Sequence, residues 1–162
     1  TWADYDNDGD LDLMVCEQGK VHLFRNETIS GQAVANSKMF PNRWLEVKLI
    51  GSDCNKSAIG ARLTLTLEKT KPPVNRVGDI PLISPLLIST RQLLREVEGG
   101  KGAGNQNSLV QHFGLGDYKG KCDLTVRWPC GRTTVHSVEP NSAETVSTNR
   151  SGTNKIVTIK EP

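Results

Sequence analysis

Apolar and polar residues alternate along short stretches of this chain, and residues that favour turns separate one stretch from the next. A period of two is typical of a β-strand with one buried face, because successive side chains of a strand point to opposite sides. The clearest case runs from Arg62 to Glu68, where Leu63, Leu65 and Leu67 occupy every second position. This stretch predicts a strand whose leucines face a core.

A second stretch, Trp44 to Leu49, places Glu46 and Lys48 two positions apart, so we expect one face to be open to water and the other to be core. We expect strands at Leu11–Cys16, Val21–Asn26, Trp44–Ile50, Ala61–Glu68, Gln92–Glu98, Leu109–Phe113, Asp123–Trp128, Thr133–Val138 and Lys155–Lys160. Hairpin turns are expected at Gln18-Gly19 and around Pro129 to Arg132. Helix signals are scarce, and the pattern predicts an all-β protein, an antiparallel β-sandwich preceded by a β-hairpin.

The alternation fails between Lys69 and Thr90, where prolines remove backbone donors and restrict their neighbours. The second half of this Pro-rich insertion, Ile80 to Ile88, is apolar and carries no charge. Two interpretations remain open: a long hairpin arm that folds onto its own sandwich, or a contact surface for a protein partner or a second copy. The residues expected in such a contact are Leu82, Ile83, Leu86, Leu87 and Ile88.

Composition excludes some classes of function and favours others. The net charge is only +2 and the basic residues are dispersed, which argues against nucleic acid as a partner. The chain has no apolar run of the roughly 18 residues that suggest a membrane span. An even number of cysteines and several Asn-x-Ser/Thr triplets favour the secretory route and an extracellular location. The triplets begin at Asn26, Asn55 and Asn149, which are the expected glycosylation sites.

The strongest motif is the acidic segment from Asp4 to Asp12, which fits the pattern D-x-D-x-D-G-x-x-D. Ca²⁺ takes six to eight oxygen ligands, and alternate carboxylates on a tightly curled loop converge on one point. Gly9 permits the sharp bend. The expected ligands are the side chains of Asp4, Asp6, Asp8 and Asp12 and the main-chain carbonyl of Asp10.

Two alternatives to a structural Ca²⁺ site exist for this segment. An EF-hand requires a bidentate Glu at the twelfth loop position, where this chain has Val15, and flanking helices, where it has a strand-like run. An acidic turn that is simply solvated is the other interpretation, and it leaves the mutual repulsion of the aspartates uncompensated. We therefore expect Ca²⁺ as the cofactor, bound at a β-turn.

Catalytic patterns are weak by comparison. The three histidines are far apart in sequence, and Gly99 to Gly104 lacks the Gly-Lys-Ser/Thr ending of a phosphate loop. No spacing suggests a nucleophile with its base, so the chain is expected not to be an enzyme. Trp44 and Trp128 can stack on sugars, which makes a carbohydrate-binding module the alternative function, although strand tryptophans more often fill cores.

Segments of the chain resemble two known families. Trp2 to Leu13, with the strand-like run Val21 to Asn26, resembles the Ca²⁺ loop and closing strand of an FG-GAP or VCBS propeller repeat. Only one such repeat is present, and the sequence starts at Thr1 directly before it, so the chain is expected to be a fragment. The resemblance implies a partial propeller blade over residues 1–28 and a linker over 29–41.

The rest of the chain resembles the ASPIC/UnbV domain over roughly 100 residues. The segments that carry the resemblance are Asn42 to Leu45, Asn55 to Arg62, Arg95 to Val97, Gly99-Gly100, Asn107 to Gly116 and Val126 to Gly131. This implies a β-sandwich domain over residues 42–162, with the insertion at 69–90 lengthening a connection that the family keeps short. Such domains are associated with extracellular, adhesion-like roles, which implies a structural or adhesive module without catalytic residues.

Cys130 is a second departure from the family, which commonly has a small residue at this place. If Arg127 to Arg132 forms a turn, the sulfurs of Cys122 and Cys130 can meet across the two strands. Cys16 and Cys54 are then left as the other pair.

Overall fold

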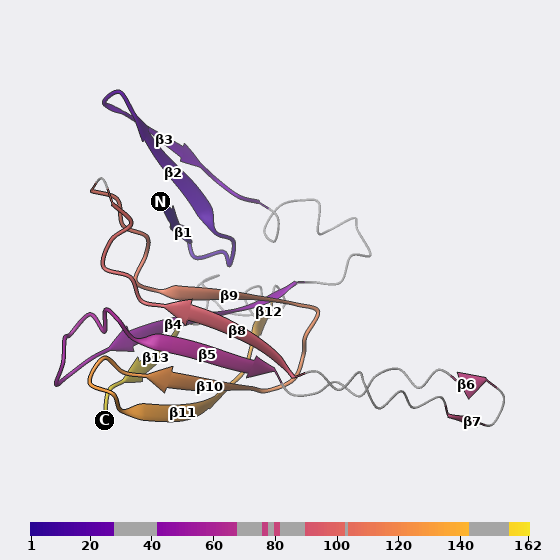
Figure 1. Cartoon of the computed structure of the whole chain (residues 1–162). Helices are drawn as coiled ribbons and strands as arrows, with labels where there is room; N and C mark the ends of the chain where they lie inside the picture. The colour runs from indigo at the N-terminus through magenta and orange to yellow at the C-terminus, as the bar shows by residue number, and fades with distance from the viewer. Residues whose placement is uncertain (28–41, 68–75, 78–79, 82–89, 103, 143–155) are drawn as a thin grey trace, which may run out of the picture.

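The computed structural model describes residues 1–27, 42–67, 76–77, 80–81, 90–102, 104–142 and 156–162. Within these residues the chain folds into strands and loops and contains no helix, as the alternating pattern predicts (Figure 1). The strands are β1 (Trp2–Ala3), β2 (Asp12–Glu17), β3 (Lys20–Phe24), β4 (Arg43–Ile50), β5 (Arg62–Leu67), β6 (Arg76–Val77), β7 (Ile80–Pro81), β8 (Arg91–Glu96), β9 (Gln111–Gly116), β10 (Cys122–Arg127), β11 (Thr133–Val138), β12 (Asn141–Ser142) and β13 (Ile156–Lys160).

Two four-stranded sheets form a sandwich. The first has the strand order β11-β10-β5-β8, and all of its pairs are antiparallel. In the second sheet β4 pairs with β9 and β12 in antiparallel fashion, and with β13 in parallel fashion. The expected β-sandwich is therefore confirmed, with one parallel pair that the sequence pattern does not predict. β6 and β7 form a separate two-stranded ribbon.

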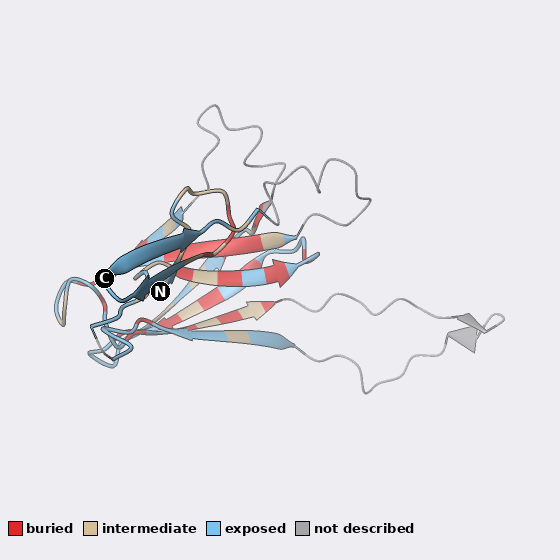
Figure 2. Cartoon of the chain, turned by 90° about the horizontal axis from the view of Figure 1, so that it is seen from above, coloured by how far each residue is buried: buried red, intermediate tan, exposed pale blue. Residues whose placement is uncertain are grey.

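The core lies between these two sheets. β5 buries every second residue, so Leu63, Leu65 and Leu67 face inward as predicted. Figure 2 shows the same alternation as bands of buried and exposed residues along the strands of the sandwich. The opposing sheet contributes Leu45, Val47, Leu49, Phe113, Leu115 and Ile159. Each such side chain contributes roughly 1.5–3 kcal/mol through removal of apolar surface from water, which makes this core the main source of stability.

β4 departs from its expected pattern. Trp44 and Glu46, which point away from the sandwich core, are nevertheless buried, with exposed fractions of 1% and 3%. The prediction that the polar face of this strand is exposed to water is therefore wrong at Glu46 and holds only at Lys48. The reason is that the segment before β2 covers this end of the strand. Trp128 is also 1% exposed, so neither it nor Trp44 offers a surface for sugar stacking.

The N-terminal sheet has the order β1-β2-β3 and is antiparallel throughout. β2 and β3 are joined at Gln18 and Gly19, which have φ angles of 45° and 80°, as a tight hairpin requires. Figure 1 shows this sheet beside the sandwich, on the side where β9 lies. The predicted hairpins at Gln18-Gly19 and at Pro129 to Arg132 are both confirmed.

The disulfide joins Cys54, in the loop after β4, to Cys130, in the turn after β10, with Cα atoms 5.8 Å apart. The expected pairs Cys122–Cys130 and Cys16–Cys54 are wrong. Cys122 opens β10, faces the core and pairs across the ladder with Val138. Cys130 lies beyond the opposite end of that six-residue strand, roughly 20 Å away. Cys16 is exposed in β2 and takes no part in this bond.

The Pro-rich segment and the predicted linker lie mainly outside the described residues. The candidate contact residues Leu82, Ile83, Leu86, Leu87 and Ile88 and the glycosylation triplet at Asn149 all fall there. The division into residues 1–28, 29–41 and 42–162 therefore stays a prediction. No helix in the described part of the chain is long and apolar enough to cross a lipid bilayer.

Candidate metal centre

The acidic segment forms a closed loop at the end of the N-terminal sheet. Ala3 pairs with Asp12 across the antiparallel β1–β2 ladder, so the two ends of the loop are held together by backbone hydrogen bonds. Asn7 and Gly9 have φ angles of 59° and 100°, in the left-handed region. These two positions curl the chain so that alternate side chains point to the inside.

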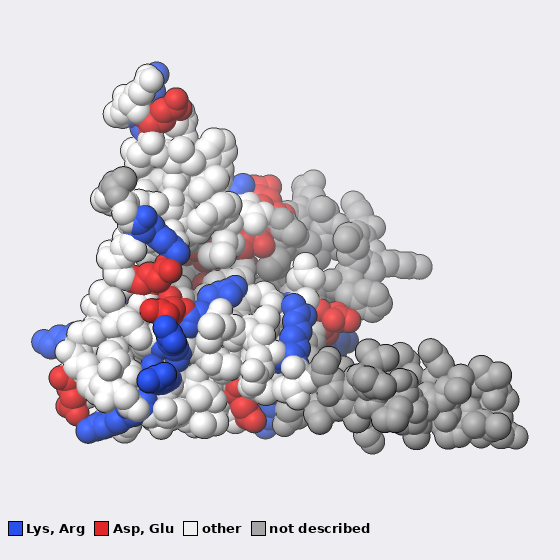
Figure 3. Space-filling view, in the orientation of Figure 1, with Lys and Arg blue, Asp and Glu red and all other residues white. Residues whose placement is uncertain are grey.

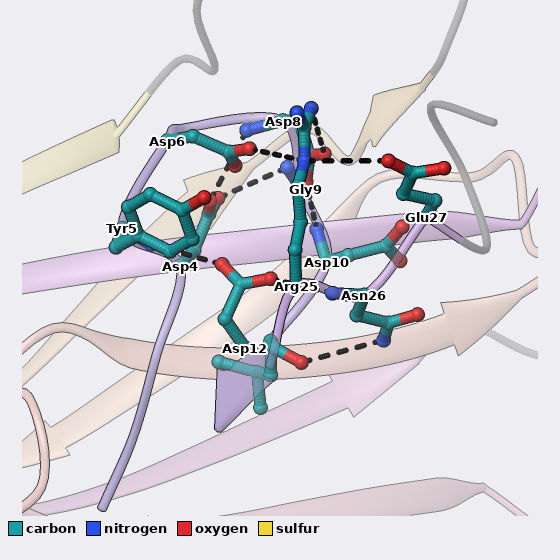
Figure 4. A network of polar contacts seen from close by, with 11 residues as sticks. Asp4, Tyr5, Asp6, Asp8, Gly9, Asp10, Asp12, Arg25, Asn26 and Glu27 are labelled. Atoms are coloured by element: carbon teal, nitrogen blue, oxygen red, sulfur yellow. Dashed lines mark hydrogen bonds and ion pairs between the residues drawn. The ribbon is translucent and has the colours of Figure 1, made fainter. Parts of the chain in front are cut away.

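Backbone amides of the loop turn toward its own carboxylates (Figure 4). Asp4 Oδ1 accepts a hydrogen bond from Asp8 N at 3.1 Å, and Asp4 Oδ2 accepts one from Gly9 N at 3.0 Å. Asp8 Oδ1 accepts one from Asp10 N at 2.9 Å. These bonds fix the curvature of the loop, because each carboxylate spans the next turn of the backbone.

The carboxylates of Asp4, Asp6 and Asp8 converge. Each of them offers an oxygen that lies within 4.8 Å of the oxygens offered by the other two. Both oxygens of Asp6 and Oδ2 of Asp8 are buried without a hydrogen bond among the described residues. Burial raises the pKa of Asp4, and the charge of Asp8 adds to this while hydrogen bonds from Gly9 and Asp8 oppose it. Burial, followed by the charge of Asp8, also raises the pKa of Asp6.

Arg25 lies over the open side of this cluster. Its Nε is 2.8 Å from Asp6 Oδ2, and its Nη2 is 3.6 Å from Asp8 Oδ2. Its Nε also lies 3.9 Å from a carboxylate oxygen of Glu27. The Asp6 charge raises the pKa of the Arg25 guanidinium. This half-exposed cation offsets part of the repulsion, and the sequence motif gives no sign of it.

Asp12 and Asp10 take different places in the loop. Asp12 is 2% exposed; its Oδ2 accepts a hydrogen bond from Tyr5 N at 3.2 Å and its Oδ1 one from Asn26 N at 2.8 Å. Its carboxylate thus ties the loop to the end of β3, and its charge still adds to the raised pKa of Asp6. The Asp10 side chain is buried. Of the five predicted ligands, the structure brings the carboxylates of Asp4, Asp6 and Asp8 into one cluster.

The loop rests on the sandwich through Gly9. A Cβ atom at this position would lie 2.3 Å from Cε2 of the Trp44 indole, so only a glycine allows this approach. The Gly9 carbonyl lies 3.0 Å from His112 Nε2 on β9. Since a carbonyl oxygen only accepts, Nε2 carries the proton and Nδ1 is the acceptor nitrogen of the neutral ring. Burial lowers the pKa of His112, which favours that neutral form.

Further polar contacts hold β1 against the loop that precedes β9. Thr1 Oγ1 donates to Gln106 O at 2.6 Å, Trp2 N donates to Asn107 Oδ1 at 3.1 Å, and Ser108 N donates to Trp2 O at 3.3 Å. The N-terminal sheet and the sandwich are thus joined at two points, the acidic loop and β1. Sequence reasoning assigned no role to Trp44 and His112 in this joint.

Two glycosylation triplets start at asparagines that the structure describes, and the side chains of both take part in loops. Asn26 Nδ2 donates to Leu11 O at 3.3 Å, and Asn55 Nδ2 donates to Ile59 O at 3.0 Å. Asn55 Oδ1 also accepts a hydrogen bond from Ile59 N at 2.8 Å. Both amides contribute to local structure; their glycosylation stays a prediction.

A second cluster of ligand-type side chains joins Glu161 to the disulfide. Glu161 Oε1 lies 3.7 Å from Cys54 Sγ and 3.5 Å from Cys130 Sγ. Its Oε2 accepts hydrogen bonds from Ser52 N at 2.7 Å and from Asp53 N at 3.1 Å, and the pKa of Glu161 is lowered, mainly by the bond from Ser52. These sulfurs are bonded to each other, so they are not available as metal ligands. The cluster instead links the end of β13 to the two loops that carry Cys54 and Cys130.

Positive and negative side chains are interleaved over the face of the sandwich seen in Figure 3. Fold and loop together define an all-β protein in which a sandwich carries a small sheet with a candidate metal loop. Residues 86–161 match the family model described as ASPIC and UnbV, which covers the strands from β8 to β13. Neither the curated proteins nor the solved structures gave a match.

The family match begins after β4 and β5, yet both strands lie at the centre of the sandwich. The structure therefore extends the sandwich toward the N-terminus beyond the matched residues, as the resemblance of Asn42 to Leu45 and of Asn55 to Arg62 implied. The resemblance of residues 1–28 to an FG-GAP or VCBS repeat stays a prediction.

Proposed function

We propose that the loop from Asp4 to Asp12 binds one Ca²⁺ ion, and that the protein is a non-enzymatic extracellular module with a structural or adhesive role. The observation that carries this proposal is the convergence of Asp4, Asp6 and Asp8 oxygens within 4.8 Å, with buried oxygens on two of them that accept no hydrogen bond. A hard cation with oxygen ligands satisfies such atoms, and Ca²⁺ accepts irregular loops of this kind.

The chain supplies the ligands that such an ion requires. Asp4, Asp6 and Asp8 would hold it with their side chains, Asp10 with its carbonyl and Asp12 with its carboxylate, as the motif predicts. When bound, the ion offsets the burial and, after it, the repulsion from Asp8 that raise the pKa of Asp4 and Asp6. Arg25, which is half exposed, is free to pair with Glu27 instead.

The position of the loop supports a structural role for the ion. Gly9 lies between two candidate ligands and also contacts Trp44 and His112, so stiffening the loop stiffens the joint between the N-terminal sheet and the sandwich. Domains of the ASPIC/UnbV family occur in extracellular proteins, and a disulfide with two described glycosylation triplets is in keeping with that location. The partner contact expected at Leu82, Ile83, Leu86, Leu87 and Ile88 belongs to this proposal.

Asp6→Ala tests the metal site, because the hydrogen bonds that fix the loop curvature go to Asp4 and Asp8, whereas the main partner of the Asp6 carboxylate is the Arg25 side chain. In saturating Ca²⁺ the variant should lose the stabilisation that binding supplies, about 2.7 kcal/mol at a Ca²⁺ concentration roughly 100 times Kd. In EDTA it should be as stable as the unchanged chain or slightly more stable, since one repelling charge is gone. Thermal melts under both conditions, with calorimetric Ca²⁺ titration, measure the effect.

Asp53→Ala is the matched control, because this aspartate is exposed and pairs with Arg132 far from the loop. It should change the melts in Ca²⁺ and in EDTA equally. Equal losses for Asp6→Ala in the two conditions, or the absence of a Ca²⁺ titration signal from the unchanged chain, would refute the metal site.

A further inference from the structure

A small pocket lies where the acidic loop meets the sandwich. Its volume is about 170 Å³, which leaves room for a small ligand. Trp2 of β1, Leu11 of the acidic loop, and Gln111 and His112 of β9 are among the residues that line it. Glu46 of β4 is buried there with an exposed fraction of 3%. The pocket is lined by residues from both regions, so it exists only while the two are joined.

Both donors and acceptors line this pocket. Asn107 uses Oδ1 to accept from Trp2 N, and its Nδ2 donor makes no bond to a described residue. Gln111 uses Nε2 to donate to Leu109 O at 3.2 Å, which leaves Oε1 as an acceptor. The His112 Nδ1 atom is an acceptor because Nε2 carries the proton toward Gly9.

The walls also carry apolar surface of a suitable kind. Trp2 is 50% exposed and lines the pocket, so it contributes aromatic surface beside the polar groups. Val110 and Ile156 add aliphatic surface. A flat aromatic ring next to paired donors and acceptors suits a ligand with an apolar face and a polar edge.

We propose that this pocket binds one neutral pyranose residue of a glycan, with a C–H face of the sugar on Trp2 and its hydroxyls on Asn107 and Gln111. A hydroxyl both donates and accepts, so it suits a wall that presents both kinds of atom. An ammonium group only donates hydrogen bonds, so it gives the Asn107 Nδ2 donor no acceptor. A sulfated or uronic sugar brings a negative charge next to Asp4 and Glu46, which also line the pocket.

This inference goes beyond the proposed Ca²⁺ site, although Asp4 borders both. Titrations with the methyl glycosides of glucose, galactose, mannose and N-acetylglucosamine, followed by protein NMR shifts, test it; methyl glucuronide and methylammonium serve as charged probes. At least one neutral glycoside should bind saturably with a Kd on the order of millimolar, as expected for a ligand of so few atoms. Running the titrations in Ca²⁺ and in EDTA separates a failure of this site from a failure of the metal site.

Two variants locate the binding. Trp2→Ala removes the stacking surface, and Asn107→Asp keeps the Oδ1 acceptor for Trp2 N while it replaces the donor by an acceptor. Each should weaken binding at least tenfold, with an unchanged melting temperature for Asn107→Asp. Val135→Ala, on the exposed side of β11, should leave binding unchanged.

Three results would overturn the proposal. One is a lack of saturable binding by every neutral glycoside. Another is binding that both Trp2→Ala and Asn107→Asp leave intact. The third is a preference for methyl glucuronide or methylammonium over the neutral probes.

Discussion

Two neighbouring regions of this molecule are built from similar strands but are stabilised in different ways. β5, in the sandwich, buries alternate residues, whereas every residue of β3, in the N-terminal sheet, is exposed. Large apolar side chains of the N-terminal sheet are open to water at Met14, Val15, Val21, Leu23 and Phe24. The alternation of apolar residues therefore does not by itself produce a core, because a second layer has to cover the sheet.

The N-terminal sheet buries little apolar surface, and polar and ionic contacts at one end stabilise it instead. Arg25 pairs with Asp6 within the acidic loop, and the contact of Gly9 with Trp44 and His112 connects the loop to the sandwich. The sandwich should therefore respond chiefly to loss of core volume. The N-terminal sheet should respond to changes in charge, in metal and at the joint.

The largest effect is expected from Leu65→Ala at the centre of β5, where the side chain is fully buried. Removal of this side chain should cost about 2–5 kcal/mol of unfolding free energy, through lost burial and the cavity left behind. Urea denaturation measures it. Leu94→Ala is the control, since this leucine of β8 is 61% exposed, and should cost less than about 1 kcal/mol. Similar losses at the two sites would contradict the assignment of the core.

A smaller effect, confined to the joint, is expected from Gly9→Ala. The added Cβ would clash with the Trp44 ring at a φ angle of 100°, and the cost should be about 1–3 kcal/mol. Gly19→Ala is the matched control, because its φ angle is 80° but open space surrounds it. Amide hydrogen exchange should show faster exchange in β2 and β3 for Gly9→Ala while β5 and β10 keep their protection. Uniform loss of protection would mean that the two regions unfold as one unit.

The smallest effect is expected from pH, and its sign should differ between the regions. The lowered pKa of Glu161 gives the sandwich stability that is present above the ordinary value of 4.5 and is lost as the pH falls through the folded-state pKa. The raised pKa of Asp6 works in the opposite direction: metal-free protein is stabilised as the pH falls through that pKa toward 3.8.

Melting curves in EDTA over this acidic range measure the two contributions. Glu161→Gln should flatten the loss of stability on acidification, and Asp6→Asn should remove the opposing gain. The interpretation fails if both substitutions change the pH profile in the same direction.

Local patterns predicted the longer strands and both hairpins, because alternation and turn residues act over a few positions. They did not predict the two-residue strands β1, β6, β7 and β12, which are too short to show a period. Sequence reasoning failed where distant segments meet. Glu46 is buried beside the acidic loop, which lies far earlier in the sequence. The cysteine pairing depends on which turns come together at one end of the sandwich. The motif predicted the acidic loop, in which the carboxylates of Asp4, Asp6 and Asp8 converge. It did not predict Arg25, which follows β3 and lies outside the motif.

The parallel pairing of β13 with β4 has a consequence for how the chain matures. The ladder joins Glu46 to Ile156, and the contact between Ser52 and Glu161 bridges a sequence separation of 109. During synthesis β4 leaves the ribosome long before β13 has been made. The backbone groups on the β13 side of β4 have no strand to pair with during that time. Such distant pairing slows folding and leaves a strand edge open to unwanted association. A nascent chain of this kind gains from chaperone protection until β13 has been translated.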